Sequence, residues 1–256
     1  MEIERRYPEQ LGEFDRVSLI LVGCGGTGSY LVRDLASLAY HARQRRGLDV
    51  MISLVDPDTV EERNCGRQNF CPAEIGANKA ETLARRHNLA FGLDIEAFPE
   101  PFNGEFLQPR SNRTLLIGAV DNAAARSEID QAVRGFRGTV LWLDAGNHEH
   151  AGQILLGNRE DLEAPEISPL GFCTGLPLPS IQAPELLTPR PAPAADSLSC
   201  AEMTAVDAQG LVVNRAVASF AAHYVSRLLI SRDLDIYATF FDLTGGSARS
   251  LGITKA

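Results

Sequence analysis

The sequence predicts an α/β protein with a Rossmann-like, mostly parallel sheet, helices on both faces, and a continuation into antiparallel strands and a C-terminal hairpin. Short apolar runs alternate with amphipathic helical stretches up to residue 157, which is typical of parallel β–α–β units. A glycine-rich turn joins the first apolar run to the first helical stretch, as in nucleotide-binding sheets. Near the C-terminus, two strand-like runs flank the turn Thr244–Ser247, which indicates a hairpin.

The expected strands are short runs rich in apolar and β-branched residues and bounded by glycine or polar turns. In chain order they are 17–23, 49–55, 94–100, 113–120, 138–146, 150–157 and the two arms of the hairpin at 235–253.

The expected helices show apolar residues at helical spacing. In the stretch 27–46, Leu31, Leu35 and Leu38 fall on one face. Asp121 and Asn122 suit the N-terminal end of a helix that runs to residue 136. The other two helices are expected at 76–90 and 201–230.

The whole chain, 1–256, is expected to form a single domain with a long proline-rich crossover loop at about 158–199. This segment shows almost no periodic pattern. An irregular segment of such length inside a compact domain is usually a functional lid or a disordered loop.

Composition excludes several classes of protein. A net charge of −9 argues against nucleic-acid binding, which usually needs a basic face. The apolar stretch 212–230 contains Arg215, His223 and Arg227, so a membrane span is not expected. The five cysteines are an odd number in a chain whose charged start is unlike a signal peptide. A reduced, cytoplasmic protein is therefore expected.

The glycine-rich turn "GCGGTG" is the first candidate binding site. Gly23, Gly25 and Gly28 lie in G-x-G-x-x-G register between a strand and a helix, with Gly26 beside them. Glycines let the backbone approach a phosphate, and the helix N-terminus offers free N–H groups. The alternative is a tight turn without ligand, and the motif by itself does not separate a dinucleotide from ATP. Asp56 ends the second strand and suits ribose hydroxyls in either case.

The stretch that follows Asp56 carries polar residues that a hydride-transfer enzyme does not need. If a carboxylate attacks the α-phosphate of ATP, two anions meet, and the site must supply positive charge, positioning and magnesium. Arg67 offers a planar fork for phosphate oxygens, and Lys79 offers a point charge. Asn64 and Gln68 can orient groups without adding charge.

Asp121 ends the strand at 113–120, where ligands of parallel sheets gather, and it is the expected magnesium ligand. Each of these residues also has an ordinary structural alternative. Arg67 suits a surface ion pair, Lys79 a solvated helix position, and Asp121 a helix cap. All of them together, in this order, favour ATP chemistry.

The ordered motifs resemble the ThiF/MoeB/HesA family, the ubiquitin-activating-type adenylating enzymes. They are G-x-G-G-x-G at 23–28, D-x-D-x-V at 56–60, N-x-x-R-Q at 64–68, G-x-x-K at 76–79 and D-N-x-x-x-R at 121–126. The nearest subfamily suggested is the ThiF-type proteins of bacterial PRTRC systems.

The resemblance implies roles for the motif residues and a reaction. Asp56 would hold the ribose, Asn64, Arg67 and Lys79 the phosphates, and Asp121 the magnesium; Asp58, Gln68 and Asn122 would join the nucleotide site. ATP and Mg²⁺ would be the cofactors. The substrate would be the C-terminal glycine carboxylate of a small ubiquitin-like or sulfur-carrier-like protein, activated by a homodimer.

Two family features are missing from this sequence. It has no C-x-x-C pair, and Cys65 and Cys71 are separated by five residues, so no structural zinc is expected. The family often has R-Y-x-R-Q near its N-terminus, whose second arginine reaches the neighbouring subunit's ATP. In "RYPEQ" Glu9 takes that place, so Arg5 or Arg6 would have to substitute, and the argument for a dimer is weaker.

A covalent step remains open. Cys200 follows the crossover segment at the expected start of a helix, where a thiolate is favoured. It is therefore a candidate thioester nucleophile, with Cys173 as the other candidate and simple packing as the alternative.

Two rival functions also remain: a degenerate, non-catalytic scaffold of this family, and an NAD- or FAD-dependent oxidoreductase.

Overall fold

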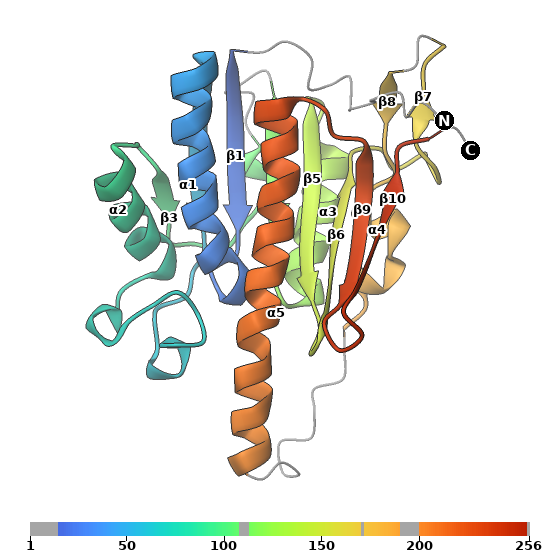
Figure 1. Ribbon diagram of the computed structural model, residues 1–256. Helices are drawn as coiled ribbons and strands as arrows, with labels where there is room; N and C mark the ends of the chain where they lie inside the picture. Colours follow the sequence, from blue (N-terminus) through green and yellow to red (C-terminus); the bar gives the residue numbers. More distant parts are fainter. Residues whose placement is uncertain (1–14, 108–112, 170–171, 190–199, 255–256) are drawn as a thin grey trace.

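The computed structural model describes residues 15–107, 113–169, 172–189 and 200–254, and for 200–211 it describes the backbone only. One eight-stranded sheet, in the order β10-β9-β6-β5-β4-β1-β2-β3, runs through the molecule (Figure 1). Its strands are β1 Arg16–Val22, β2 Asp49–Val55, β3 Glu96–Phe98, β4 Thr114–Gly118, β5 Val140–Asn147, β6 Ala151–Gly157, β9 Ile236–Asp242 and β10 Ser247–Gly252.

The sheet is parallel from β3 to β5 and antiparallel from β6 to β10. In β1, β4 and β5 nearly every residue is buried, because a parallel strand is covered on both faces. The predicted fold class, including the antiparallel strands and the C-terminal hairpin, is therefore confirmed.

Helices cover both faces of the sheet (Figure 1). On one face α1 Gly26–Arg46, α2 Lys79–Phe91 and α5 Cys200–Ser226 pack over the larger apolar core. On the other face α3 Ala123–Gly135 and α4 Pro179–Gln182 flank the smaller core around Trp142. A π-helical turn, Arg227–Ser231, follows α5, and the first part of α5 extends past the end of the sheet. None of the described helices is long and apolar enough to cross a membrane.

Two of the helices that begin at the predicted site, α2 and α3, have side-chain caps. The carbonyl oxygen of the Asn78 side chain accepts from the N–H of Glu81, and that of Asn122 accepts from the N–H of Ala125. Such caps satisfy N–H groups that have no partner within the helix. They place Lys79 at the first position of α2 and Asp121 directly before α3.

The crossover segment is more regular than its sequence predicts. It contains β7 Glu166–Ile167, β8 Cys173–Gly175, α4 and the 3₁₀ turn η5 Pro184–Leu187. Its side chains Leu176, Leu178, Ala183 and Leu186 are buried. Elements of two to four residues are too short to show periodicity, so their regularity could not be seen in the sequence. Residues 190–199 lie outside the described part of the chain.

Candidate nucleotide-binding site

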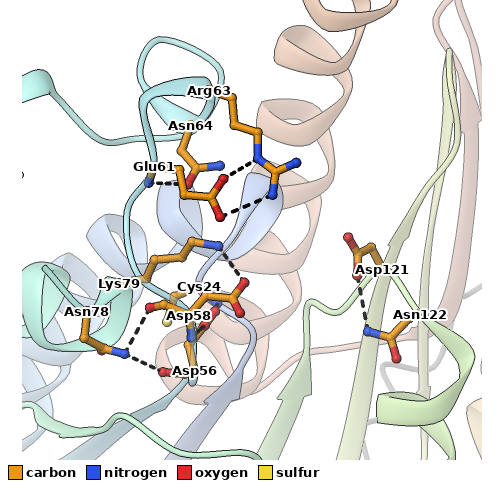
Figure 2. Close-up of polar contacts among 10 residues, drawn as sticks. All are labelled: Cys24, Asp56, Asp58, Glu61, Arg63, Asn64, Asn78, Lys79, Asp121 and Asn122. Atoms are coloured by element: carbon orange, nitrogen blue, oxygen red, sulfur yellow. Dashed lines mark hydrogen bonds and ion pairs between the residues drawn. The ribbon is translucent and has the colours of Figure 1, made fainter. Parts of the chain in front are cut away.

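A cavity of about 950 Å³ opens at the carboxyl ends of β1, β2, β4 and β5, where ligands of open α/β sheets bind. Figure 2 shows Asp56, Asp58 and Lys79 on one side, and Asp121 and Asn122 facing them from the other. Most of the predicted site residues line this cavity: Gly23, Gly25, Gly26, Asp56, Asp58, Arg67, Gln68, Lys79, Asp121 and Asn122.

The glycine loop needs its glycines for different reasons. Gly23 has φ = +91°, a backbone conformation that other residues rarely adopt. Gly28 does not line the cavity; a Cβ there would lie 1.9 Å from the carbonyl oxygen of Gly23. Gly28 therefore lets α1 pack closely against the end of β1, while Gly25 and Gly26 present backbone to the cavity.

Asp56 links the glycine loop to the second strand. Its Oδ2 accepts from the N–H of Cys24 at 2.5 Å, and its Oδ1 accepts from the N–H of Asp58 at 2.8 Å. Burial raises the pKa of this carboxyl above its usual range, while the two N–H bonds and Lys79 oppose that shift. Each carboxylate oxygen has a second lone pair, so a ribose hydroxyl can still be accepted.

Lys79 lies in the cavity wall with its charge already paired. Its ammonium group donates to Asp58 Oδ2 at 2.8 Å. The Lys79 side chain is only 7% exposed, whereas that of Asp58 is 65% exposed. Asn78 steadies this corner, since its amide donates to the carbonyl oxygens of Asp56 and Asp58. The buried cation is thus held in place, and the exposed Asp58 can move away when a phosphate approaches.

Arg67 and Gln68 bring a cation and an amide to the opposite side of the glycine loop. Arg67 is half-buried and lines the cavity. Gln68 is buried, and its Oε1 has no hydrogen-bond partner in the described part of the chain. Because buried polar atoms are nearly always paired, this orphan oxygen indicates that a water or a ligand completes the site.

Asp121 and Asn122 are exposed at the mouth of the cavity, and the Asn122 amide donates to Asp121 Oδ1 at 3.3 Å. Among the described residues, no group of three or more His, Cys, Asp or Glu side chains could hold a metal. Mg²⁺ bound with a nucleotide typically takes one or two carboxylates together with phosphate oxygens and water, and Asp121, which lines the cavity, can serve as one such carboxylate.

Besides Gly28, two predicted site residues are not among those that line the cavity. Asn64 is buried but does not line the cavity. Its Oδ1 accepts from the N–H of Glu61 at 2.8 Å, and it thereby closes its own 3₁₀ turn, η2 Glu62–Asn64. Cys200 is the first residue of α5, and its side chain lies outside the described residues, as do Arg5, Arg6 and Glu9. No contact of the described structure therefore supports a phosphate role for Asn64.

Two of the described cysteine thiols, those of Cys24 and Cys173, are poor nucleophiles. Cys24 is fully buried within the glycine loop, and burial raises the pKa of its thiol well above the usual value. Burial raises the pKa of Cys173 to about 11, and its thiol donates to the carbonyl oxygen of Gly175. A thiolate is the reactive form, so the geometry disfavours Cys173 as a thioester acceptor.

Several cavity residues were missed from the sequence: Thr27, Phe102, Glu128, Asn147, Glu149 and Asn214. Asn147 ends β5, and its position at the end of a parallel strand was a usable signal. Asn214 lies inside a long helix with mixed composition, where no local pattern distinguishes it.

Arg126, the last residue of the D-N-x-x-x-R motif, anchors α3 to the sheet. Its Nε donates to Asp144 Oδ1 at 3.0 Å, and both side chains are buried. Burial raises the pKa of Asp144, and Arg126 opposes that shift. The pair fixes the first turn of α3 against β5 and thereby holds Asp121 and Asn122 at the cavity.

This architecture can be compared with known proteins. The sequence pattern of the ThiF family matches residues 5–247. The chain belongs to the ThiF family. The resemblance predicted from the motifs is thus confirmed at the family level.

Among curated ThiF-related proteins, ubiquitin-like modifier-activating enzyme 6 of Homo sapiens is 29% identical over 128 residues, 46% of this chain and 12% of that protein. Ubiquitin-like modifier-activating enzyme 5 of Arabidopsis thaliana is 29% identical over 161 residues, 56% of this chain and 34% of that protein. The enzyme 5 of Dictyostelium discoideum is 30% identical over 149 residues, 53% of this chain and 36% of that protein. The matched part of this ThiF-family chain therefore covers between 12% and 36% of the length of these relatives.

A solved structure shares the fold of this ThiF-family chain. The crystal structure of selenomethionine-labelled PaaA matches with a TM-score of 0.57 over 96% of this chain and 67% of that one. The identity is 16%, so the likeness concerns the fold alone.

Proposed function

We propose that this protein uses ATP to adenylate the C-terminal glycine carboxylate of a small ubiquitin-like or sulfur-carrier-like protein. The observation that carries the proposal is that Arg67, Lys79 and Asp121, which come from separate segments of the chain, line one cavity with the glycine loop. Family membership and relatives named as ubiquitin-like modifier-activating enzymes support the same chemistry.

In the proposed reaction, a carboxylate oxygen attacks the α-phosphorus of ATP. A bond forms between this oxygen and phosphorus, the bond to the bridging oxygen breaks, and pyrophosphate leaves with both electrons of that bond. No general base is needed, because a C-terminal carboxyl is ionised at neutral pH. Magnesium, when bound, neutralises phosphate charge.

The residues of this chain supply positioning and electrostatic stabilisation. Arg67 and Lys79 neutralise the negative charge that gathers on the phosphates. Asp56 orients the ribose, and Asp121 would hold the magnesium at the mouth of the cavity. Each of these side chains lines the same hollow, so each can reach a single bound nucleotide.

Exchange of labelled pyrophosphate into ATP, dependent on a protein with a C-terminal glycine, tests this proposal. Arg67→Ala and Asp121→Ala are each expected to slow the exchange on the order of a hundredfold, the usual cost of losing one electrostatic stabiliser. Unchanged exchange in both variants contradicts the assigned roles.

Matched controls use exposed residues outside the cavity. Arg85 on α2 and Asp94 before β3 are exposed and do not line the cavity, so Arg85→Ala and Asp94→Ala should exchange at the wild-type rate.

A nucleotide-binding experiment separates the rival functions. Protection from unfolding by Mg-ATP but not by NAD supports adenylation, whereas protection by NAD alone supports an oxidoreductase. ATP binding without exchange supports a scaffold.

Narrower features of the proposal remain predictions. They are the relation to the PRTRC systems, a homodimer, a cytoplasmic location, and a thioester on Cys200. For the thioester, Cys200→Ala should abolish a thiol-sensitive conjugate and leave pyrophosphate exchange intact. If Cys200 is only a packing residue, Cys200→Ala should leave both the conjugate and the pyrophosphate exchange intact.

A further inference from the structure

Asn214 of α5 reaches the glycine loop from a distant part of the chain. It is 7% exposed and lines the nucleotide cavity. Its neighbours Val213 and Val217 are buried in the core, and the next residue, Arg215, lies over the ring of Tyr30 on α1, 4.8 Å from its centroid. The helix is thus fixed against α1, and the place of the Asn214 amide is fixed with it.

Two hydrogen bonds determine how the Asn214 amide is oriented. Its Oδ1 accepts from the hydroxyl of Thr27 at 3.3 Å and from Nδ2 of Asn147 at 2.5 Å. In this arrangement Thr27 and Asn147 act as donors, and the oxygen of Asn214 lies between them. The Nδ2 group of Asn214 makes no hydrogen bond to any described residue, and its two N–H donors remain available.

The same amide lies directly over Gly26, the first residue of α1. A Cβ at position 26 would lie 2.6 Å from Nδ2 of Asn214, so a larger residue there would push the Asn214 amide out of its place. The first N–H groups of a helix have no partner within the helix and attract anions. Free amide donors beside them, within a cavity, therefore face the position that a phosphate would occupy.

We propose that Asn214 is a nucleotide-binding residue whose Nδ2 group donates to an oxygen of the phosphate chain above Gly26. This inference rests on the proposed ATP-dependent function. It adds a hydrogen-bond donor from α5 to the predicted phosphate site at the glycine loop. Asn147 and Thr27 are positioning residues, since they hold the oxygen of Asn214 and so turn its nitrogen toward the ligand.

The test compares Asn214→Asp and Asn214→Ala for binding of Mg-ATP and of adenosine by calorimetry. Asn214→Asp keeps an oxygen for Thr27 and Asn147 but replaces the donor by a carboxylate that repels phosphate. It should weaken ATP binding about tenfold or more, since a hydrogen bond to a charged group carries such a factor, and leave adenosine binding unchanged. Asn214→Ala should also weaken the binding of ATP and not that of adenosine, but the loss of ATP affinity should be smaller.

Ser219→Ala is the control, because Ser219 is exposed on the same helix and lies outside the cavity lining. Wild-type ATP affinity in Asn214→Asp overturns the inference, because a purely structural role needs only the retained oxygen. If that variant does not fold, Asn214→Ala decides: an equal loss for ATP and adenosine overturns the inference. A wild-type protein that binds no ATP contradicts the proposed function itself.

Discussion

At the scale of single residues, the described site combines a buried cation, Lys79, with a buried amide oxygen of Gln68 that lacks a partner. Lys79 is held by Asp58 at 2.8 Å before any nucleotide binds, and Gln68 Oε1 is buried without a partner in the described structure. Both features cost stability in the absence of ligand, because desolvated polar groups are unfavourable unless fully paired. A bound nucleotide would supply the missing partners, which is the arrangement expected of a binding site.

A residue outside the site, His87 of α2, gives a prediction about pH. It is buried, neither ring nitrogen has a hydrogen-bond partner among the described residues, and its ring lies 6.2 Å from that of Phe91. Burial lowers its pKa below 6.5, and the charges of Arg86 and Arg33 add to that shift.

The unfolded chain therefore takes up a proton on this histidine at a higher pH than the folded protein does. Stability rises with pH wherever the unfolded state binds more protons, so the contribution of His87 is lost as pH falls below about 6.5. In His87→Leu, denaturant unfolding at pH 7 and pH 5 should show a smaller loss on acidification than in wild type. Parallel losses in both proteins contradict the prediction.

At the scale of elements, α3 fastens the crossover segment to the body of the protein. Arg134 donates to Asp130 at 2.7 Å, to Glu160 at 2.6 Å and to the hydroxyl of Ser180 at 3.2 Å. The Ser180 hydroxyl in turn donates to Asp130. Glu160 and Ser180 belong to the crossover segment, so one arginine ties its start and its middle to α3.

Arg134→Met should loosen this segment while leaving the nucleotide cavity intact, because Arg134 does not line that cavity. The free energy of unfolding should fall by about 1 kcal/mol or more, since Asp130 is buried and loses its charged donor. Hydrogen exchange should rise in residues 158–189, and ATP affinity should not change. Arg85→Met on the exposed side of α2 is the matched control, and unchanged exchange at 158–189 would contradict the role of Arg134.

At the scale of the whole molecule, one sheet carries both halves of the chain. The parallel strands β1 to β5 place the glycine loop, Asp56 and Asp121 at one edge, and the antiparallel strands β6, β9 and β10 extend the sheet beyond them. The larger apolar core is continuous across α1, α2 and α5, which pack on one face of the sheet.

Purified protein is expected to contain well under one zinc ion per chain. The sequence has no C-x-x-C pair, and a structural zinc needs four closely placed ligands. Elemental analysis after dialysis checks this. Stoichiometric zinc that resists dialysis would contradict the expectation, and Cys173, Cys200 and the histidines would then be tested as its ligands.

The sequence by itself determined the alternating architecture and most of the charged residues that line the cavity. Apolar periodicity is a local property, and it predicted the strands and helices because each element buries one face or one run of side chains. Gly23, Asp56 and Asp121 were found because each ends or follows an expected strand, and Lys79 was found as a cation in the G-x-x-K motif. The carboxyl ends of parallel strands necessarily meet at one edge.

Only the tertiary structure decided which of these side chains face the ligand. Asn64 turned out to close its own turn, and the apolar residues of the crossover segment proved to be buried. Asn214 and Thr27 are hydrogen-bonded across 187 residues of sequence. Contacts of this kind depend on how α5 packs against α1. That packing is determined by the whole core, so it cannot be predicted from a local pattern of residues.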